Sequence, residues 1–172
     1  MAGIKMTYIF CYDDHRSFTD EVKKRFSDSE RYVVESYHNP GDFLENVRKE
    51  RDSRSCRVAI IGVPDSAGQY DKIAEMTVEI KKADTNTGII LLVHQDKLDG
   101  LRKTVVFNID AYIPRNSNAV LRIHNNVKRL ISERNIAIFR KRKILSLYAL
   151  LAFLILIILM FLVARIKLPQ YF

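Results

Sequence analysis

The chain has 172 residues, of which 28 are Lys or Arg and 20 are Asp or Glu, giving a formal net charge of +8. The positive excess is local, because residues 1–139 carry 22 basic and all 20 acidic residues, while residues 140–172 carry six basic residues and no acidic one. The first segment is long enough for one α/β domain, and its near-balanced charge gives no reason to expect nucleic acid as a partner. Cys11 and Cys56 lie in or beside apolar runs without metal-like spacing, which predicts buried thiols in a reducing compartment.

Five short apolar runs alternate with amphipathic stretches between residues 6 and 133. Strands are expected at 6–12, 32–37, 56–63 and 88–93, and around 111–113. Helices are expected at 16–26, from Asp42, around 73–80, at 96–104, and from Asn118. Asp42 follows the turn Asn39-Pro40-Gly41 and is expected to cap the second helix. This strict alternation predicts an α/β fold with a five-stranded, doubly wound parallel sheet and helices on both faces.

The stretch 144–163 reads ILSLYALLAFLILIILMFLV and contains no charge, no glycine and no proline. At about 1.5 Å rise per residue, such a helix is about 30 Å long, which matches the hydrocarbon core of a bilayer. It predicts one C-terminal transmembrane helix. Seven basic residues lie shortly before this stretch and two follow it, so the positive-inside rule places the N-terminal domain in the cytoplasm. The expected parts are a domain (1–133), a basic juxtamembrane helix (134–143), a transmembrane helix (144–164) and a short extracytoplasmic tail (165–172).

Four consecutive basic residues, Arg140, Lys141, Arg142 and Lys143, flank the apolar stretch directly. Such side chains interact favourably with anionic headgroups, so membrane lipid is an expected partner. No glycine or proline occurs between Pro114 and Pro169, so the last helix of the domain is expected to run unbroken into the span. A break near Asn135 is the alternative.

Three motifs follow one another in a familiar order. They are the acid pair Asp13-Asp14 closing the first strand, the turn from Pro64 to Gly68 after the third, and the segment Ala111-Tyr112-Ile113-Pro114-Arg115-Asn116 at the fifth. With these motifs the sequence resembles the receiver domains of two-component response regulators over residues 5–133. The resemblance implies a flavodoxin-like sheet with strand order 2-1-3-4-5.

The resemblance also implies where the phosphotransfer residues would lie, and three of the four positions are altered. In the family, paired acids and an aspartate on the third strand hold Mg²⁺, that aspartate accepts the phosphoryl group, and a Ser or Thr and a Lys contact its oxygens. Asp13 and Asp14 match the acid pair, but the acceptor position falls on Ile60 or Gly62, and Val93 and Arg115 match the other two positions. The expectation is a vestigial acidic pocket formed by Asp13, Asp14, Gly62, Val93 and Arg115. No catalytic residue and no cofactor are expected, apart from weak Mg²⁺ binding at Asp13 and Asp14.

Other interpretations stay open at this point. Asp65, just past the third strand, is an alternative acceptor, and Asp13 and Asp14 are alternatively solvated acids at a strand end or a cap of the next helix. The aromatic run 8–12 with its acidic patch, followed by the turn at Asn39, also resembles TIR domains. Some of those cleave NAD, which would make this chain an enzyme on the same fold.

The function expected from these features is that of a non-enzymatic signalling or scaffold module at the cytoplasmic face of a bacterial inner membrane. It would act by protein contacts, including a possible homodimer, through a face that contains Tyr112, Ile136, Ile138 and Phe139. The alternative is a small membrane subunit of an envelope or secretion assembly, in which the transmembrane helix makes the key contacts. Ser146, Ala149 and Ala152 line one face of that helix and suit close helix packing.

Overall fold

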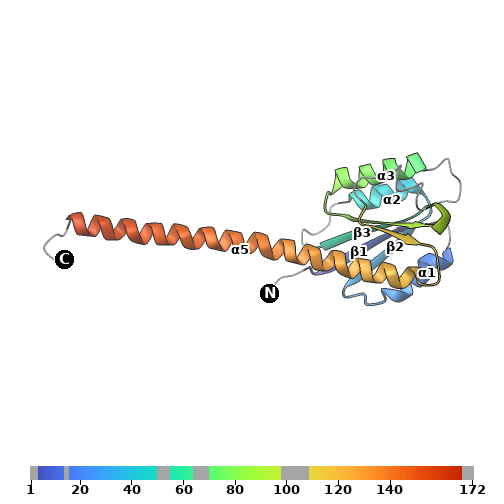
Figure 1. Cartoon of the computed structure of the whole chain (residues 1–172), viewed down its shortest axis with the longest axis horizontal. Coiled ribbons are helices and arrows are strands. Elements are labelled where there is room, and N and C mark those ends of the chain that lie inside the picture. Colours follow the sequence, from blue (N-terminus) through green and yellow to red (C-terminus); the bar gives the residue numbers. More distant parts are fainter. Residues whose placement is uncertain (1–3, 14–15, 50–54, 64–69, 98–108, 168–172) are drawn as a thin grey trace. The chain divides into compact units, whose positions relative to one another are not determined.

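The computed structural model describes residues 4–13, 16–49, 55–63, 70–97 and 109–167. They fall into two compact units, Met1–Arg134 and Asn135–Phe172, and the first unit contains the whole sheet (Figure 1). The elements in chain order are β1 (Met6–Tyr12), α1 (Arg16–Arg25), β2 (Tyr32–Tyr37), α2 (Pro40–Arg48), β3 (Ser55–Gly62), α3 (Tyr70–Ala83), β4 (Gly88–Val93), the 3-10 helix η2 (Gln95–Lys97), β5 (Ala111–Pro114) and α5 (Ala119–Lys167).

The sheet has five parallel strands in the order β2-β1-β3-β4-β5, which confirms the predicted doubly wound fold. The central strands β3 and β4 are buried along almost their whole length, because helices cover both faces of the sheet. That is why their sequences are continuous apolar runs. Pro114 is the last residue of β5. A proline is tolerated in this strand because β5 lies at the edge of the sheet.

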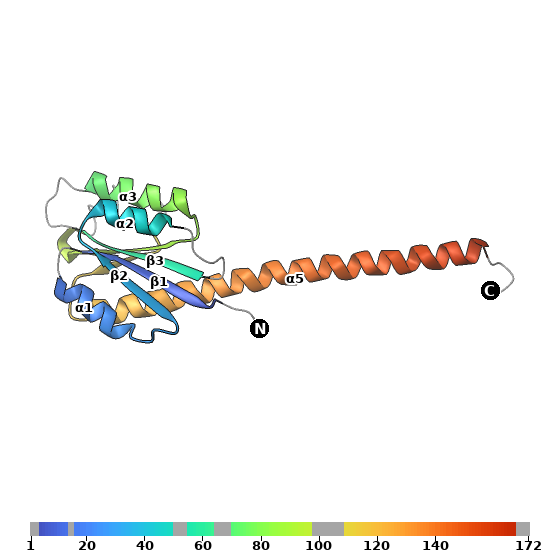
Figure 2. The ribbon, with the colours of Figure 1, turned by 180° about the vertical axis from the view of Figure 1, so that it is seen from behind.

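One apolar cluster lies on each face of the sheet. Successive side chains along a strand belong alternately to the two clusters. On one face α1 and the first part of α5 pack on the strands, with Val22, Phe26, Ile123 and Val127 buried against Ile60 and Leu92. On the other face α2 and α3 contribute Phe43, Val47, Ile73 and Ile80, which are buried against Ile61 and Leu91. Figures 1 and 2 show this three-layer arrangement of the first unit from opposite sides.

Two local expectations differ from the structure. The N-cap of α2 is Asn39, whose side-chain oxygen accepts the backbone N–H of Gly41 at 3.0 Å, with Pro40 in the first turn. Proline suits that position because it has no N–H to satisfy, so Asp42 lies inside the helix and is not its cap. Of the helix expected at 96–104, the structure shows the 3-10 turn Gln95–Lys97, and residues 98–108 lie outside the described part of the chain.

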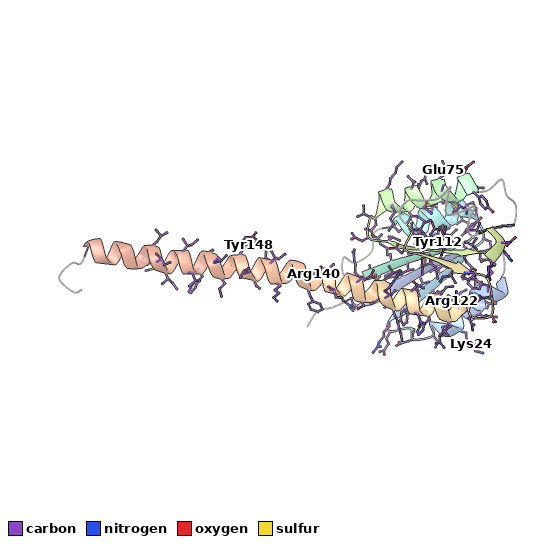
Figure 3. All side chains as sticks on the ribbon, viewed as in Figure 1. Lys24, Glu75, Tyr112, Arg122, Arg140 and Tyr148 are labelled. Carbon is purple, nitrogen blue, oxygen red and sulfur yellow. The ribbon has the colours of Figure 1, made fainter. Side chains whose placement is uncertain are left out.

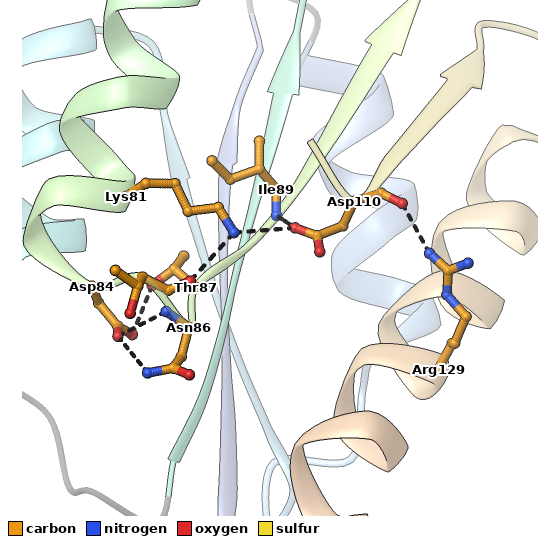
Figure 4. A network of polar contacts seen from close by, with 8 residues as sticks. Lys81, Asp84, Asn86, Thr87, Ile89, Asp110 and Arg129 are labelled. Atoms are coloured by element: carbon orange, nitrogen blue, oxygen red, sulfur yellow. Dashed lines mark hydrogen bonds and ion pairs between the residues drawn. The ribbon is translucent and has the colours of Figure 1, made fainter. Parts of the chain in front are cut away.

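A polar network ties α3, β4, the start of β5 and α5 together (Figure 4). One carboxylate oxygen of Asp110 accepts the backbone N–H of Ile89 at 2.8 Å and lies 3.4 Å from the Lys81 ammonium. The guanidinium of Arg129, on α5, donates to the backbone carbonyl of Asp110 at 2.9 Å. Asp84 pairs with Arg57 on β3 at 2.6 Å. The Arg129 hydrogen bond fixes α5 to the amino edge of the sheet, and the other contacts fix the end of α3 there.

Beyond Arg134 the chain continues as helix. α5 is one helix of 49 residues, as the absence of glycine and proline predicted. It contains the one stretch, among the described residues, that is long and apolar enough to cross a membrane, and no side chain of that stretch is buried. Figure 3 shows the side chains of Arg140 and Tyr148 on this part of α5.

Candidate functional site

The carboxyl edge of the sheet collects the residues that the sequence placed in one pocket. Tyr12 pairs with Ile61, so Asp13, which follows β1, lies level with Gly62, the last residue of the neighbouring β3. The backbone N–H of Arg115 donates to the carbonyl of Val93 at 2.8 Å, which brings the ends of β4 and β5 together. Four of the five predicted pocket residues therefore lie at this edge, and Asp14 lies outside the described residues.

Asp13 is buried, with 2% of its surface exposed, and its carboxylate Oδ2 lies 2.8 Å from Nη2 of Arg115. Its backbone is held as well. The N–H of Asp13 donates to the backbone carbonyl of Tyr37 at 3.4 Å, and the carbonyl of Asp13 accepts the Nδ1–H of His38 at 2.9 Å. The interpretation of Asp13 as a solvated acid at a strand end is therefore wrong. The acid is an internal partner for the cation at the end of β5.

Gly62 lies where the pocket needs space. A Cβ atom added at Gly62 would lie 2.3 Å from Oδ2 of Asp13 and 2.7 Å from Nη2 of Arg115. Of the two candidate acceptor positions, Gly62 is thus the one that faces the pocket, while Ile60 is buried in the cluster beneath α1 and α5. β3 therefore supplies no carboxylate at the place where the other two residues meet.

Arg115 fills the pocket from the β5 side. Its side chain is 13% exposed, and its guanidinium carbon lies 6.0 Å from the ring centroid of Phe18 on α1. Its Nε is buried and meets no hydrogen-bond acceptor among the described residues. The guanidinium of Arg115 thus forms an ion pair with Asp13 and a cation–π contact with the ring of Phe18. Sequence reasoning missed Phe18 and His38, because neither belongs to the motifs that placed the other residues at this pocket.

The described pocket residues do not fit the magnesium ion of the receiver family. Mg²⁺ requires a cluster of oxygen ligands, whereas Asp13 already binds a cation and Gly62 has no side chain. Within the described ranges no group of three or more His, Cys, Asp or Glu side chains could hold a metal ion. Weak binding by Asp13 together with Asp14 stays a prediction, as does the alternative acceptor Asp65, because Asp14 and Asp65 lie outside the described residues.

Val93 lies at this edge, but its side chain is fully buried in the cluster beneath α2 and α3. The remaining predicted residues are separate from the pocket, and Tyr112 is half-buried against the same cluster (Figure 3). Ile136 and Phe139 are 48% and 44% exposed on α5 in the second unit, where Ile138 is half-buried. Arg140 and Lys143 are exposed on the same helix, while the side chains of Lys141 and Arg142 are outside the described set.

Both cysteines are buried and free, as predicted. Burial, reinforced by the negative charge of Asp13, raises the pKa of the Cys11 thiol to about 12. Burial likewise raises the pKa of Cys56 to about 11, against the opposing effect of the Arg134 charge. Because the thiolate is the reactive form, both side chains are structural at neutral pH.

No protein-family model matches the sequence, and no curated protein matches it. Solved structures do. A response regulator receiver domain protein from Clostridium thermocellum has 16% identity and a TM-score of 0.60, covering 76% of this chain and 98% of that chain. The response regulator TrrA from Thermotoga maritima, in complex with Mg²⁺ and BeF, has 22% identity and a TM-score of 0.53, covering 73% of this chain and 99% of that chain.

An adenylate cyclase from Rhodopirellula baltica also matches, with 14% identity and a TM-score of 0.59, covering 81% of this chain and 96% of that chain. Because all three structures have less than 25% sequence identity to this chain, they show that the fold is similar and nothing more. The first unit has the receiver fold, with the flavodoxin-like strand order.

Proposed function

We propose that this chain is a membrane-anchored, receiver-like module that acts through protein contacts and does not run the phosphotransfer cycle. The observation that carries the proposal is the composition of the pocket. Gly62 replaces a carboxylate nucleophile, and the space beside it is crossed by the ion pair between Asp13 and Arg115. A phosphoryl group therefore has no acceptor on β3, and Asp13 is already committed to a cation.

The α5 helix supports the anchoring part of the proposal. It contains an apolar stretch long enough to cross a bilayer, preceded by four consecutive basic residues from Arg140 to Lys143. On this account the first unit lies at the cytoplasmic face of an inner membrane. The exposed apolar side chains of Ile136 and Phe139, together with Tyr112, are the candidate contacts for a partner protein or a second copy.

Acylphosphate formation tests the central part of the proposal. The full chain, purified in detergent, is incubated with acetyl phosphate and Mg²⁺ and its intact mass is measured, beside a receiver domain with an intact acceptor as positive control. We expect a phosphoadduct on the control and none on this chain, since Gly62 offers no nucleophile. An acid-labile adduct on this chain would show that another carboxylate has taken over, and the non-catalytic proposal would then be wrong.

A further inference from the structure

A cavity lies at the amino edge of the sheet, where β1 and β2 begin. It has a volume of about 390 Å³ and is lined by Ile4, Lys5, Thr7, Arg31, Tyr32 and Ile131. All of these residues belong to the first unit. The cavity is thus separate from the pocket around Gly62, and the function proposed above makes no use of it.

The walls of this cavity are fixed by the backbone. The N–H of Thr7 donates to the carbonyl of Arg31 at 2.8 Å, which joins β1 to the turn before β2. The N–H of Tyr32 donates to the carbonyl of Asp28 at 2.8 Å, and its ring lies edge-on to Phe26 with the centroids 5.0 Å apart. Thr7 is itself buried. The β1–β2 wall of the cavity is therefore held by the backbone.

Two cations and two hydroxyl groups meet two apolar side chains here. Lys5 is exposed, and Arg31 is 77% exposed, pairing through Nε with Asp28 at 3.5 Å. A solvent-exposed ion pair of that length is weak, so the Asp28 carboxylate is a poor competitor for a stronger anion. Guanidinium, ammonium and hydroxyl groups are the donors that bind phosphate oxygens, while Ile4 and Ile131 offer an apolar wall. The lining suits an anion that carries an apolar part.

The chain itself limits how far this cavity lies from a membrane. Ile131 lines the cavity, and the apolar stretch begins at Ile144, thirteen residues later. Thirteen residues span at most about 45 Å fully extended and about 20 Å as helix. The chain therefore tethers the cavity within that distance of the apolar stretch, so an inserted stretch holds the first unit near a lipid surface.

We propose that this cavity binds the phosphate of an anionic phospholipid headgroup, with Lys5 and Arg31 as its cationic contacts. The inference rests on the proposed membrane anchoring and adds a specific lipid contact on the folded domain. It is distinct from the general attraction of the basic residues 140–143 to an anionic surface, because it requires a defined cavity.

Site-resolved lysine acylation of the full chain in nanodiscs tests this proposal. Discs of phosphatidylcholine are compared with discs that also contain phosphatidylglycerol, and acylation rates are read by peptide mass spectrometry. Lys5 is expected to react several-fold more slowly in the anionic discs. Lys24 and Lys72, which are exposed outside the cavity, are expected to react at equal rates in both. Arg31→Gln should abolish the protection of Lys5, whereas Arg122→Gln, an equal charge change at an exposed site, should not.

Each other outcome is decisive. Equal Lys5 rates in both discs, equal protection of Lys24, or protection that survives Arg31→Gln would overturn the proposal. Protection of Lys5 by inorganic phosphate in phosphatidylcholine discs, without added protection from phosphatidylglycerol, would assign the cavity to a free anion and overturn the lipid source. A chain that fails to co-migrate with either disc would contradict the membrane anchoring itself, which separates the failure of that proposal from the failure of this one.

Discussion

At the scale of single residues, Gly62 determines what the pocket can do. Its missing side chain gives Asp13 and Arg115 the room to meet at 2.8 Å, and in the proposed function it also leaves β3 without a nucleophile. The attraction between two buried charges is largely offset by the cost of removing them from water, so the pair adds little to the net stability of the fold. Here it links the end of β1 to the end of β5, across β3 and β4.

Gly62→Ala is expected to destabilise the first unit by about 1–3 kcal/mol, the usual cost of overpacking. The new Cβ would lie 2.3 Å from Oδ2 of Asp13, whose short and buried side chain has little freedom to move away. Chemical unfolding of the full chain in detergent measures the loss. Gly41→Ala is the matched control, because its nearest contact would be an ordinary 3.5 Å. Equal stability of the two variants would mean that the pocket is looser than described.

Breaking the pocket ion pair from one side is expected to be costly. Asp13→Asn or Arg115→Gln should each reduce the free energy of unfolding by about 3–5 kcal/mol, because each leaves one buried charge without its partner. The double variant should cost clearly less than the sum of the two single variants, which a double-mutant cycle measures. In contrast, Glu45→Gln at the exposed pair with Lys49 should cost at most about 1 kcal/mol. Additive effects at Asp13 and Arg115 would contradict a direct interaction.

At the scale of elements, the strands were more predictable than their contacts. β2 and β4 begin and end at the predicted residues, because each is rich in aromatic or branched apolar residues and is closed by polar or turn residues. The choice between Ile60 and Gly62 was not predictable, since a strand buried on both faces has no polar alternation to show which side chain faces which way. The pairing of Asp13 with Arg115 spans 102 positions and follows from strand order and register alone.

The connection from α3 to β4 makes stability depend on pH. Burial raises the pKa of Asp84, but the backbone N–H of Asn86, the charge of Arg57 and the Thr87 hydroxyl outweigh burial and lower the pKa below its usual 3.8. A lowered folded-state pKa means that this stabilisation is present above pH 3.8 and is lost as the pH falls through the folded value. Unfolding measured against pH should therefore show a loss below pH 3.8 that is smaller in Asp84→Asn. Identical pH profiles would exclude Asp84 as a contributor.

At the scale of the whole molecule, charge and hydropathy divide the chain more sharply than the fold does. The receiver-like unit is nearly neutral, and the excess positive charge lies at residues 140–143 and after the apolar stretch. In the proposed function the apolar stretch only anchors the chain, whereas in the alternative membrane-subunit role it makes specific contacts.

Exchanging the stretch separates these two roles. Replacement of residues 144–163 by an unrelated apolar helix of equal length should leave membrane insertion and the partner contacts of the first unit unchanged, since length and hydropathy suffice for an anchor. Partners are compared by crosslinking in native membranes. The triple substitution of Ser146, Ala149 and Ala152 by leucine is the sharper control, because it removes only the small-residue face. Loss of the same crosslinks in both variants would favour the membrane-subunit role.

The most direct test of the closed pocket is an amide NMR titration of the full chain in nanodiscs with Mg²⁺ and then beryllofluoride. We expect no change at the amides of Asp13, Gly62, Val63 and Arg115, because Gly62 offers no carboxylate and Arg115 already binds Asp13. A saturable shift at these amides that spreads into α5 would contradict the closed pocket. The pocket would then bind a phosphoryl analogue, and α5 would be the element that carries the response.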